Sequence, residues 1–478
     1  MMEPWLLAIA VMAAAAILSW LSLTRYLTFN AGHLDLGDIV QTLWNTGHGA
    51  LFQQTALLVA SQESHLAEHA DFWLVPLSLP YRIWPSATWL LGLQAVAVAC
   101  GAVPLWAIAK RLLAPGWSLI VPILYLAYPA MYWAVNFDFH TDTLAIPLML
   151  LAAWAAIEER WKTYLAVGLV LVLAKEDVAA AVGGMGLFTT VVQRKPKIGL
   201  PMAVVGLGWA VLAVFWVVPH FHLGLGPPQS ARYGYLGHGP VAILIGLFGH
   251  PQRWAPIVFS RPDAVYAVAL LVPLGLLPLL DLRWWIPALP TLAANLLAAY
   301  PAQHTIYFQY TATMIPFLAI ASIYGLVNLR RWLARLGWPK LARPSPWPAL
   351  ALAVALGATA QVIGGPVPGS VHSLPSEYRM GRSGAALEHA IGLIPPHLAV
   401  SATNAGGAYL ANRRVLYLFP VGWRQSCAVL VDQGSALDSG PYAGPISSAL
   451  RQVEADPGFV RRYSQDGVSL LLRRSCGA

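Results

Sequence analysis

The chain has 478 residues, of which 58% are hydrophobic and only 10% are charged, with a formal net charge of +8. Soluble globular domains carry about 25% charged residues, so this composition excludes an ordinary soluble domain. The basic excess does not indicate a nucleic-acid partner, because basic residues of membrane proteins collect in the loops that stay in the cytoplasm.

Apolar runs of about 20 residues recur over residues 1–365 and are long enough to cross a bilayer as helices. They predict an all-α polytopic membrane domain with about eleven spans. The first run has neither a positively charged start nor a cleavage site of small residues, so we expect it to be retained as a helix. The predicted spans cover residues 5–24, 86–109, 117–135, 142–157, 163–174, 178–192, 198–219, 263–280, 284–299, 311–329 and 347–364.

Basic residues lie at alternate ends of these spans, and this asymmetry orients the chain in the membrane. If the N-terminus is cytoplasmic, the even-numbered spans end at the basic clusters, and all 13 histidines fall on the outer face. The pattern predicts a multi-pass protein of the plasma membrane with its polar chemistry on the outer side. The cytoplasmic clusters are Lys110-Arg111, Arg160 with Lys162, Arg194 to Lys197, Arg283, and Arg330 to Arg343.

Two long outer loops are predicted, at residues 25–85 and 220–262, and Asp38 to His48 in the first has the pattern of a short amphipathic helix. A linker rich in Gly and Pro at 366–376 precedes a more charged region, 377–478, which we expect to be a small extracytoplasmic α/β domain. Strands are predicted there at 399–403, 415–419, 428–432 and 468–472, and helices at 382–394 and 444–455.

The C-terminal region also contains two of the three cysteines, Cys427 and Cys476. Outside the cytoplasm they could form a disulfide, but two cysteines do not make a disulfide framework and the sequence leaves both states open. Cys100 lies in an apolar run, where we expect it to be a small core residue.

The first outer loop begins with acidic residues, Asp35 and Asp38, at a predicted helix start. Three residues apart, both could face one pocket, although either could instead cap the helix. Acids close to a bilayer are costly and are therefore usually functional. We expect a carboxylate here to act as a general base that takes the proton of an acceptor hydroxyl as it attacks a sugar.

Further along the same loop, His65, Glu68 and His69 match the H-x-x-E-H pattern of inverted zinc proteases. Two histidines one helical turn apart could bind a divalent metal such as Mg²⁺, Mn²⁺ or Zn²⁺, but no third ligand is identifiable from sequence. A hydrogen-bonding role for His69 is the alternative that needs the fewest assumptions, and we weigh it above both metal hypotheses.

Two more polar groups lie between spans that follow. Asp138, His140 and Asp142 separate the third and fourth spans; one of them could cap the fourth helix, but three such groups exceed what a cap needs. Lys175-Glu176-Asp177 separates the fifth and sixth spans. Full charges there are costly unless they are paired or functional.

Basic residues on the outer face could neutralise a phosphate on the leaving group. Lys175 is one candidate, although it could simply pair with a neighbouring acid. The other candidates are Arg232, Arg253, Arg261 and His304.

Several short motifs, taken in order, resemble the predicted membrane proteins grouped as domain of unknown function 2079. Each motif is weak alone, and the order and spacing carry the match. The chain departs from the family pattern at Val40, where an acid often precedes the glutamine. The motifs are Asp35-Leu36-Gly37, Gln41, Leu43-Trp44-Asn45, His48-Gly49, His69, Pro76-Leu77, Phe137 to His140, Asp142, Lys175 to Asp177, Val400 to Asn404, and Val431-Asp432.

That family resembles the GT-C glycosyltransferases, which are polytopic enzymes that use polyprenyl-phosphate sugars. The resemblance implies that Asp35 is the catalytic acid group, that the donor is a polyprenyl-phosphate sugar in contact with membrane lipids, and that the acceptor is an extracytoplasmic glycan, lipid or protein. His69, Asp138, His140, Asp142, the 175–177 triplet, Arg232 and His304 would then bind substrate.

The rival hypothesis is a lipid or solute transporter, or flippase, without covalent chemistry. It predicts inverted repeats and charges near the middle of the bilayer. The sequence has no visible repeat, and its charges lie at the outer ends of the spans, which favours the enzyme. A purely structural or sensory protein would leave the acidic loop without a reason.

Overall fold

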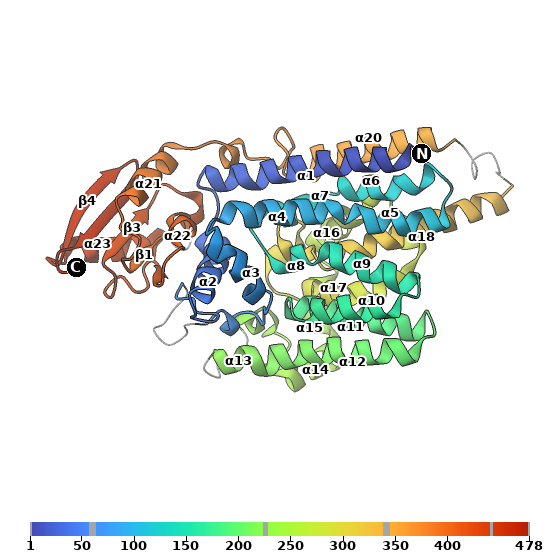
Figure 1. Cartoon of the computed structure of the whole chain (residues 1–478). Helices are drawn as coiled ribbons and strands as arrows, with labels where there is room; N and C mark the ends of the chain where they lie inside the picture. The colour runs from blue at the N-terminus through green and yellow to red at the C-terminus, as the bar shows by residue number, and fades with distance from the viewer. Residues whose placement is uncertain (1, 57–63, 223–227, 338–344, 440–442, 477–478) are drawn as a thin grey trace.

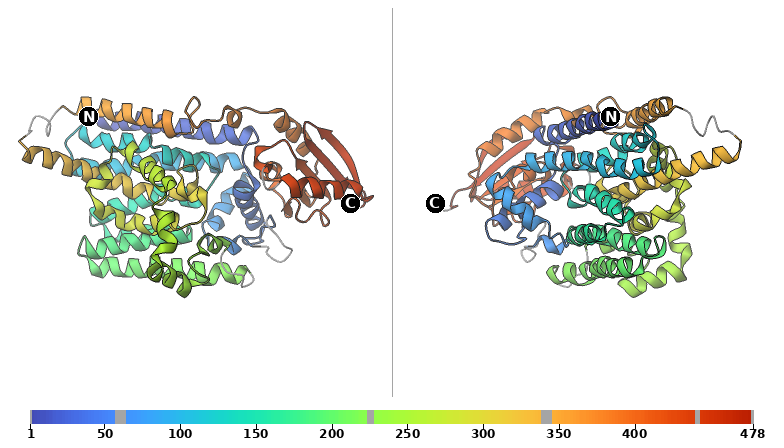
Figure 2. Two further views of the ribbon diagram at one scale, coloured as in Figure 1. Left: turned by 180° about the vertical axis from the view of Figure 1, so that it is seen from behind. Right: turned by 45° about the vertical axis from the view of Figure 1, so that its right-hand side comes forward.

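The computed structural model describes residues 2–56, 64–222, 228–337, 345–439 and 443–476. Arg343, part of the predicted basic clusters, lies outside these ranges, as do short parts of both long outer loops. Within the described residues, a bundle of apolar helices forms most of the molecule, and a small sheet domain lies at one end of it (Figures 1 and 2).

The bundle is built from helices that lie side by side, with α1 (Glu3–Leu27) and α20 (Pro346–Gly364) along one edge (Figure 1). Their side chains form one large buried apolar cluster. The other main helices are α4 (Ala87–Cys100), α5 (Ala102–Leu112), α6 (Ile120–Leu126), α7 (Pro129–Asn136), α8 (Thr141–Leu144), α9 (Ile146–Ile157), α10 (Trp161–Val172), α11 (Glu176–Val191), α12 (Pro196–Leu212), α13 (Val218–Phe221), α16 (Arg261–Leu271), α17 (Leu289–Leu296) and α18 (Ile315–Arg335).

Among the described residues, five helices are long and apolar enough to cross a membrane, or six if one bent pair counts as a span. The count of eleven is therefore not confirmed. Two further predicted spans correspond to shorter apolar helices, at Thr141–Ile157 and Trp161–Val172. The long helices are Glu3–Leu27, Ala87–Leu112, Trp117–Asn136, Pro196–Phe221 and Pro346–Gly364, and the bent pair is Pro251–Val258 with Arg261–Leu274.

The predicted spans 263–280 and 284–299 are not single α-helices. After α16 the chain forms three short 3₁₀ segments, Val272–Leu274, Leu277–Leu280 and Leu282–Ala288, before α17 begins. Each 3₁₀ segment contains a proline, which lacks the backbone N–H that an α-helix interior requires. Hydropathy detects the apolar stretch but not these interruptions.

Helices α11 and α12 approach each other closely because glycines line their contact. A Cβ atom added at Gly186 would lie only 2.2 Å from the backbone nitrogen of Ala203. Small residues let membrane helices pack backbone to backbone in this way. Helix α11 begins directly after Lys175 and contains the other two residues of the charged triplet, Glu176 and Asp177.

The first outer loop is largely helical where the structure describes it. A single π-helical turn, η1 (His33–Gly37), leads directly into α2 (Asp38–Gly47), which confirms the amphipathic helix expected at Asp38 to His48. A 3₁₀ turn, η2 (His65–Ala67), and α3 (Leu74–Ile83) follow. The second outer loop contains η5 (Pro228–Tyr233), α14 (Pro240–Gly249) and α15 (Pro251–Val258).

The C-terminal domain contains a five-stranded sheet in the order β2-β1-β3-β5-β4. Strand β1 (Val400–Ala402) pairs in parallel with β2 (Leu416–Leu418) and β3 (Ala428–Asp432), whereas β5 (Val468–Arg473) is antiparallel to β3 and to β4 (Phe459–Gln465). Opposite Ala428 lie Val400 on β1 and Leu472 on β5. The helices are α21 (Arg382–Gly392), α22 (Asn404–Leu410) and α23 (Ala443–Ala455).

Four of the five strands match the predicted ones, and the sequence misses β4 because this edge strand carries exposed Arg461 and Arg462. Cys427 and Cys476, left open by the sequence, form a disulfide. It ties the segment after the last strand to the start of β3.

The first outer loop and the C-terminal domain share one buried apolar cluster. Leu36, Leu43 and Leu74 of the loop pack in it together with Leu387 and Leu430 of the domain. The domain therefore packs directly on the segment that carries Asp35.

Candidate active site

Asp35 lies in the η1 turn at the junction between the helix bundle and the C-terminal domain. Its side chain is 33% exposed, while the flanking Leu36 and Gly37 are buried. The Nε2 atom of His140 lies 3.5 Å from its Oδ1 atom. Asp35 is therefore a carboxylate that faces open space and has an imidazole beside it.

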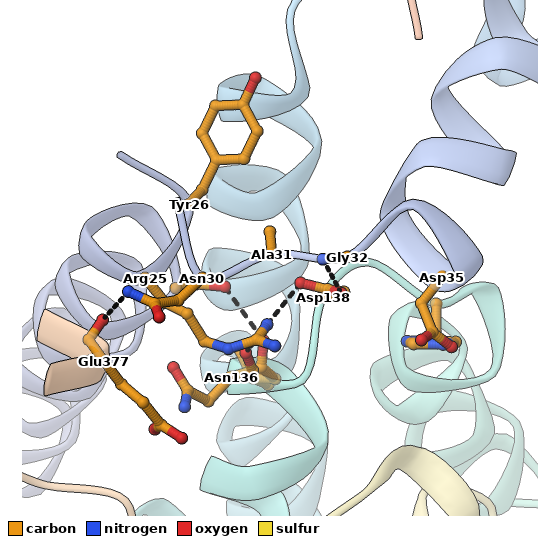
Figure 3. Close-up of polar contacts among 12 residues, drawn as sticks. Arg25, Tyr26, Asn30, Ala31, Gly32, Asp35, Asn136, Asp138 and Glu377 are labelled. Carbon is orange, nitrogen blue, oxygen red and sulfur yellow. Dashed lines mark hydrogen bonds and ion pairs between the residues drawn. The ribbon is translucent and has the colours of Figure 1, made fainter. Parts of the chain in front are cut away.

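A buried ion pair holds the chain just before this turn (Figure 3). Arg25, in the last turn of α1, pairs with Asp138, and it also donates to the backbone oxygen of Asn136 at 3.2 Å. The second carboxylate oxygen of Asp138 accepts the Gly32 N–H at 3.3 Å. Asp138 thus acts on the Asp35 turn through the backbone.

Gln94 of α4 fixes the segment that contains Asp138 and His140. Its amide nitrogen donates to the Asp138 carbonyl at 2.9 Å, and its amide oxygen accepts the His140 N–H at 2.8 Å. The ring of Phe137 stacks on the His140 ring with centroids 5.8 Å apart. These contacts set the position of the imidazole next to Asp35.

Asp38 lies behind Asp35 and is only 2% exposed. Within the described structure neither of its carboxylate oxygens has a hydrogen-bond partner, and the nearest cationic candidate is His33 Nε2 at 3.8 Å. Burial, followed by the charges of Glu68 and Asp35, holds the pKa of Asp38 well above its usual range. Burial also lowers the pKa of His33 to about 3, so that ring is neutral.

Lys175 and Asp142 form a buried ion pair, with 3.1 Å between Nζ and Oδ2. Their burial is tolerated because each charge has a partner, and Asp142 also accepts the Thr143 N–H at 2.7 Å. The charge of Lys175 is thus partly compensated before any ligand binds. The alternative in which Lys175 pairs with an acid is therefore the arrangement observed, and the acid is Asp142.

Glu176 holds the loop that contains His69. The Nδ1 atom of His69 lies 2.6 Å from Glu176 Oε1, and the Ala70 N–H donates to Oε2 at 3.2 Å. The hydrogen-bonding alternative for His69 is therefore correct. The third member of the triplet, Asp177, accepts the N–H of Val178 at 2.8 Å.

The inner wall of the site carries two acids that the sequence analysis did not select, Glu68 and Asp71. Glu68 accepts a hydrogen bond from Gln54 at 3.1 Å, and Asp71 accepts one from Thr141 at 2.5 Å. Burial raises the pKa of Glu68 to about 7 and holds the pKa of Asp71 well above its usual range. Glu68 was visible in the sequence only as part of the protease-like pattern.

Three adjoining cavities meet at His69 and Lys175, which line all of them. The smallest, 60 Å³, is bordered by Asp35, Asp38 and other acids, and the middle one, 380 Å³, opens onto Asp35 and Arg232. The largest, 990 Å³, lies between α12, α14 and α17. Its apolar wall includes Ala210, Val214, Phe215, Val218, Leu236, Ile243, Leu247 and Leu297.

Arg232 lies where the middle and large cavities meet. Its guanidinium group lies over the rings of Tyr300 and Tyr310, at 4.7 and 5.4 Å from their centroids, and donates to Gln303 Oε1 at 3.0 Å. Among the ion pairs of the described residues, none involves Arg232. It therefore presents an uncompensated positive charge to the cavities.

His304 does not line any of these three cavities. Its Nδ1 atom lies 2.6 Å from Asp263 Oδ1 and its Nε2 atom 2.6 Å from the Ala298 carbonyl oxygen. With both ring nitrogens occupied by protein groups, the side chain anchors the loop around residue 304. Its predicted contact with substrate is not supported by this placement.

His65 and His69 have ring centroids 6.3 Å apart, and His65 is buried. Over the part of the chain that the structure describes, no group of three or more His, Cys, Asp or Glu side chains is arranged to hold a metal ion. Nδ1 of His69 is already engaged by Glu176. A metal at this pair remains a prediction from the sequence.

Comparison with known proteins identifies the family to which the chain belongs. The model of the family described as "Predicted membrane protein (DUF2079)" matches residues 25–436. The chain belongs to this family. No curated relative matches it.

Solved structures share the fold of this DUF2079 chain. ArnT from Cupriavidus metallidurans bound to undecaprenyl phosphate superposes with a TM-score of 0.56 at 12% identity, over 97% of both chains. Its apo state gives 0.53 over the same shares. The Archaeoglobus fulgidus oligosaccharyltransferase is similar at a TM-score of 0.47 and 13% identity, over 99% of this chain and 75% of that one. The likeness to ArnT shows a shared fold of the GT-C type.

The segment matched by the DUF2079 model contains every residue discussed for the site. Of the residues chosen from sequence, the cavities bring together Asp35, Asp38, His65, His69, His140, Asp142, Lys175 to Asp177 and Arg232. The sequence analysis missed Gln94, and it also missed Gln309 and Tyr310, which line the cavities. A lone glutamine within the apolar run of 87–100 was the available signal for the first of them.

Proposed function

We propose that this DUF2079 protein is a membrane glycosyltransferase that moves a sugar from a polyprenyl-phosphate donor to an extracytoplasmic acceptor, with Asp35 as the general base. The observation that carries the proposal is the series of cavities from an apolar chamber, past Arg232 and Lys175, to Asp35. The fold shared with ArnT, which was solved bound to undecaprenyl phosphate, supports this class of lipid.

The donor would bind with its isoprenoid chain in the 990 Å³ cavity, whose wall is mostly apolar. Its phosphate would lie near Arg232 and Lys175, which line both the apolar cavity and the middle one. Arginine binds phosphate in a bidentate manner, and here its charge is not compensated by a carboxylate within the described structure. The sugar would then extend into the 380 Å³ cavity toward Asp35.

In the proposed reaction Asp35 takes the proton from an acceptor hydroxyl while that oxygen forms a bond to the anomeric carbon. The bond between this carbon and the phosphate oxygen breaks, and polyprenyl phosphate leaves with the electron pair. Attack opposite the leaving group inverts the anomeric configuration. Arg232 and Lys175 would stabilise the charge that develops on the phosphate.

Among the other site residues, His140 would orient Asp35, and Asp138 would fix the backbone of its turn. Asp38, which borders only the smallest cavity together with Asp35, is proposed as the second catalytic carboxyl. His69, Asp142, Glu176 and Asp177 would shape the wall around Lys175.

The proposed topology has a cytoplasmic N-terminus in the plasma membrane and an extracytoplasmic C-terminal domain. About eleven crossings would include the short and 3₁₀-interrupted segments between α16 and α17 in addition to the long helices. The Cys427–Cys476 disulfide supports an oxidising compartment for the C-terminal domain, because disulfides rarely persist in the cytoplasm. The acceptor would be a glycan, a lipid or a protein.

The test uses purified protein in proteoliposomes, a panel of radiolabelled polyprenyl-phosphate sugars and an acceptor mixture of envelope lipids and glycans. We expect wild type to transfer label and Asp35→Asn to lose transfer by about 100-fold or more, the size of effect typical of a lost general base. Glu388→Gln, a carboxylate-to-amide change at an exposed position of α21, is the matched control and should retain activity.

Equal transfer by wild type and Asp35→Asn would remove Asp35 from the mechanism. The competing hypothesis of a flippase makes a different prediction, since its cavity would carry the lipid without covalent chemistry. Movement of labelled lipid across the vesicle membrane, with no product from any donor, would favour that alternative.

A further inference from the structure

Helix α22 of the C-terminal domain lies directly against the turn that carries Asp35. The side-chain oxygen of Asn404, its first residue, accepts the N–H of Leu34 at 3.1 Å. A Cβ atom at Gly32 would lie 3.1 Å from the same oxygen, so the backbone of the turn and this side chain are in close contact. The hydrogen bond therefore restrains the residue immediately before Asp35.

The second contact is steric and centres on His33, which is completely buried. A Cβ atom at Gly407 would lie 2.2 Å from His33 Nδ1, so only glycine lets α22 come this close to the ring. On the opposite side of the contact, a Cβ atom at Gly37 would lie 2.7 Å from His33 Cδ2 and 3.3 Å from the Cα of Ala408. The ring is thus enclosed by the turn and the helix.

The rest of the domain keeps α22 in place. Asp438 accepts the N–H groups of Asn404 and Ala405 at 2.8 and 3.0 Å. At the other end of α22, the Tyr409 hydroxyl donates to the Tyr26 carbonyl at 2.6 Å and accepts the Ala31 N–H at 3.4 Å. The segment on which Asp35 depends is therefore held from the domain as well as from the bundle, where Asp138 accepts the Gly32 N–H (Figure 3).

We propose that α22 is a positioning element for Asp35, so that the C-terminal domain completes the active site through Asn404 and Gly407. These residues do not line the three cavities and would act only through the turn. The structural part of this inference is independent of the reaction, whereas its consequence for catalysis rests on the proposed function.

The first experiment measures hydrogen–deuterium exchange of peptides that cover residues 33–37 in the full-length protein. Asn404→Ala removes the acceptor for Leu34 and should speed exchange there about tenfold, the effect expected for one lost hydrogen bond. Gly407→Ala should speed exchange across the turn, because the new methyl group displaces His33. Asn404→Asp keeps an oxygen acceptor and should restore slow exchange.

Two control variants separate this role from general loosening of the domain. Gly406 lies on the same helix as Asn404 and Gly407. In Gly406→Ala the added Cβ atom would lie 3.1 Å from Cδ2 of Leu430, within the domain and away from the turn. Asn412→Ala removes a different contact of the domain, to Tyr81 and to the Pro85 carbonyl. Exchange at 33–37 that is unchanged in the Asn404 and Gly407 variants, or equally fast in both controls, would overturn the proposal.

The second experiment measures sugar transfer by the same variants. We expect kcat to fall about tenfold or more in Asn404→Ala and Gly407→Ala with KM for the lipid donor unchanged, and Asn404→Asp to recover most of it. Unchanged kcat in variants whose turn exchanges faster would overturn the catalytic role. If wild type transfers no sugar, the proposed function fails, and the exchange data still decide whether α22 positions the turn.

Discussion

Among single residues, Asp35 is distinguished from Asp38 and Asp71 by the exposure of its side chain. The Asp38 side chain is 3% exposed and Asp71 is buried, whereas the Asp35 side chain is 33% exposed beside His140. A buried carboxyl is more easily kept protonated than one that faces solvent, and a base must be ionised to take a proton. The first outer loop therefore contains several acids of which one suits the role of base.

The raised pKa of Glu68 predicts how the stability of the protein depends on pH. This pKa is raised from 4.5 to about 7, so the folded protein binds this proton more tightly than the unfolded chain. The corresponding stabilisation is complete below about pH 4.5 and is lost as the pH rises through about 7. Glu68→Gln should therefore gain apparent stability over wild type between pH 5 and 8, by about 2 kcal/mol at the upper end.

This difference can be measured as apparent melting temperature in detergent at a series of pH values. Gln can still accept the hydrogen bond from Gln54, so the variant changes the titration more than the contacts. Glu388→Gln, at an exposed position, should show no such trend. If the difference in melting temperature between wild type and Glu68→Gln is the same at all pH values, the raised pKa of Glu68 is contradicted.

Among the secondary-structure elements, those predicted from sequence are the ones whose pattern is local. The amphipathic helix α2 and four strands of the sheet follow from residue spacing, and so do the long apolar helices. The 3₁₀ segments between α16 and α17 depend on where Pro273, Pro278 and Pro287 fall within apolar runs, and the hydropathy pattern does not contain that information. Contacts such as that of Gln94 with the 138–140 segment, and that of α22 with the Asp35 turn, join residues far apart in sequence.

The contact of α11 with α12 allows a prediction about packing. Gly186→Ala should lower stability by about 1–3 kcal/mol, because its methyl group would overlap the backbone of Ala203. Gly208→Ala, on α12 with nothing within 4 Å of the added methyl group, should be neutral or slightly stabilising. Melting temperatures of the two variants give the comparison. Equal melting temperatures for the two variants would mean that α11 and α12 can move apart at Gly186 without loss of stability.

In the molecule as a whole, the outer loop, the bundle and the C-terminal domain converge on one region. The bundle provides Lys175, Asp142 and Gln94, the second outer loop provides Arg232, and the first outer loop provides Asp35. The C-terminal domain packs on that loop through a common apolar cluster. The proposed lipid binding and the proposed catalysis depend on different residues of this region, so each can be tested separately.

Arg232 is the residue that should separate them. Arg232→Gln removes the cation at the junction of the apolar and middle cavities and leaves Asp35 and its contacts in place. We expect the affinity for undecaprenyl phosphate to fall about 10- to 100-fold, as for a lost charge-assisted contact, with a matching rise in KM for the donor.

The matched control is Arg253→Gln. Arg253 is an exposed arginine of α15 that lines none of the three cavities, so this variant should bind like wild type. Binding is measured as the rise in melting temperature with added undecaprenyl phosphate, and undecaprenol serves as the ligand without phosphate. If Arg232→Gln loses affinity for undecaprenol to the same extent, Arg232 maintains the shape of the cavity and does not bind the phosphate.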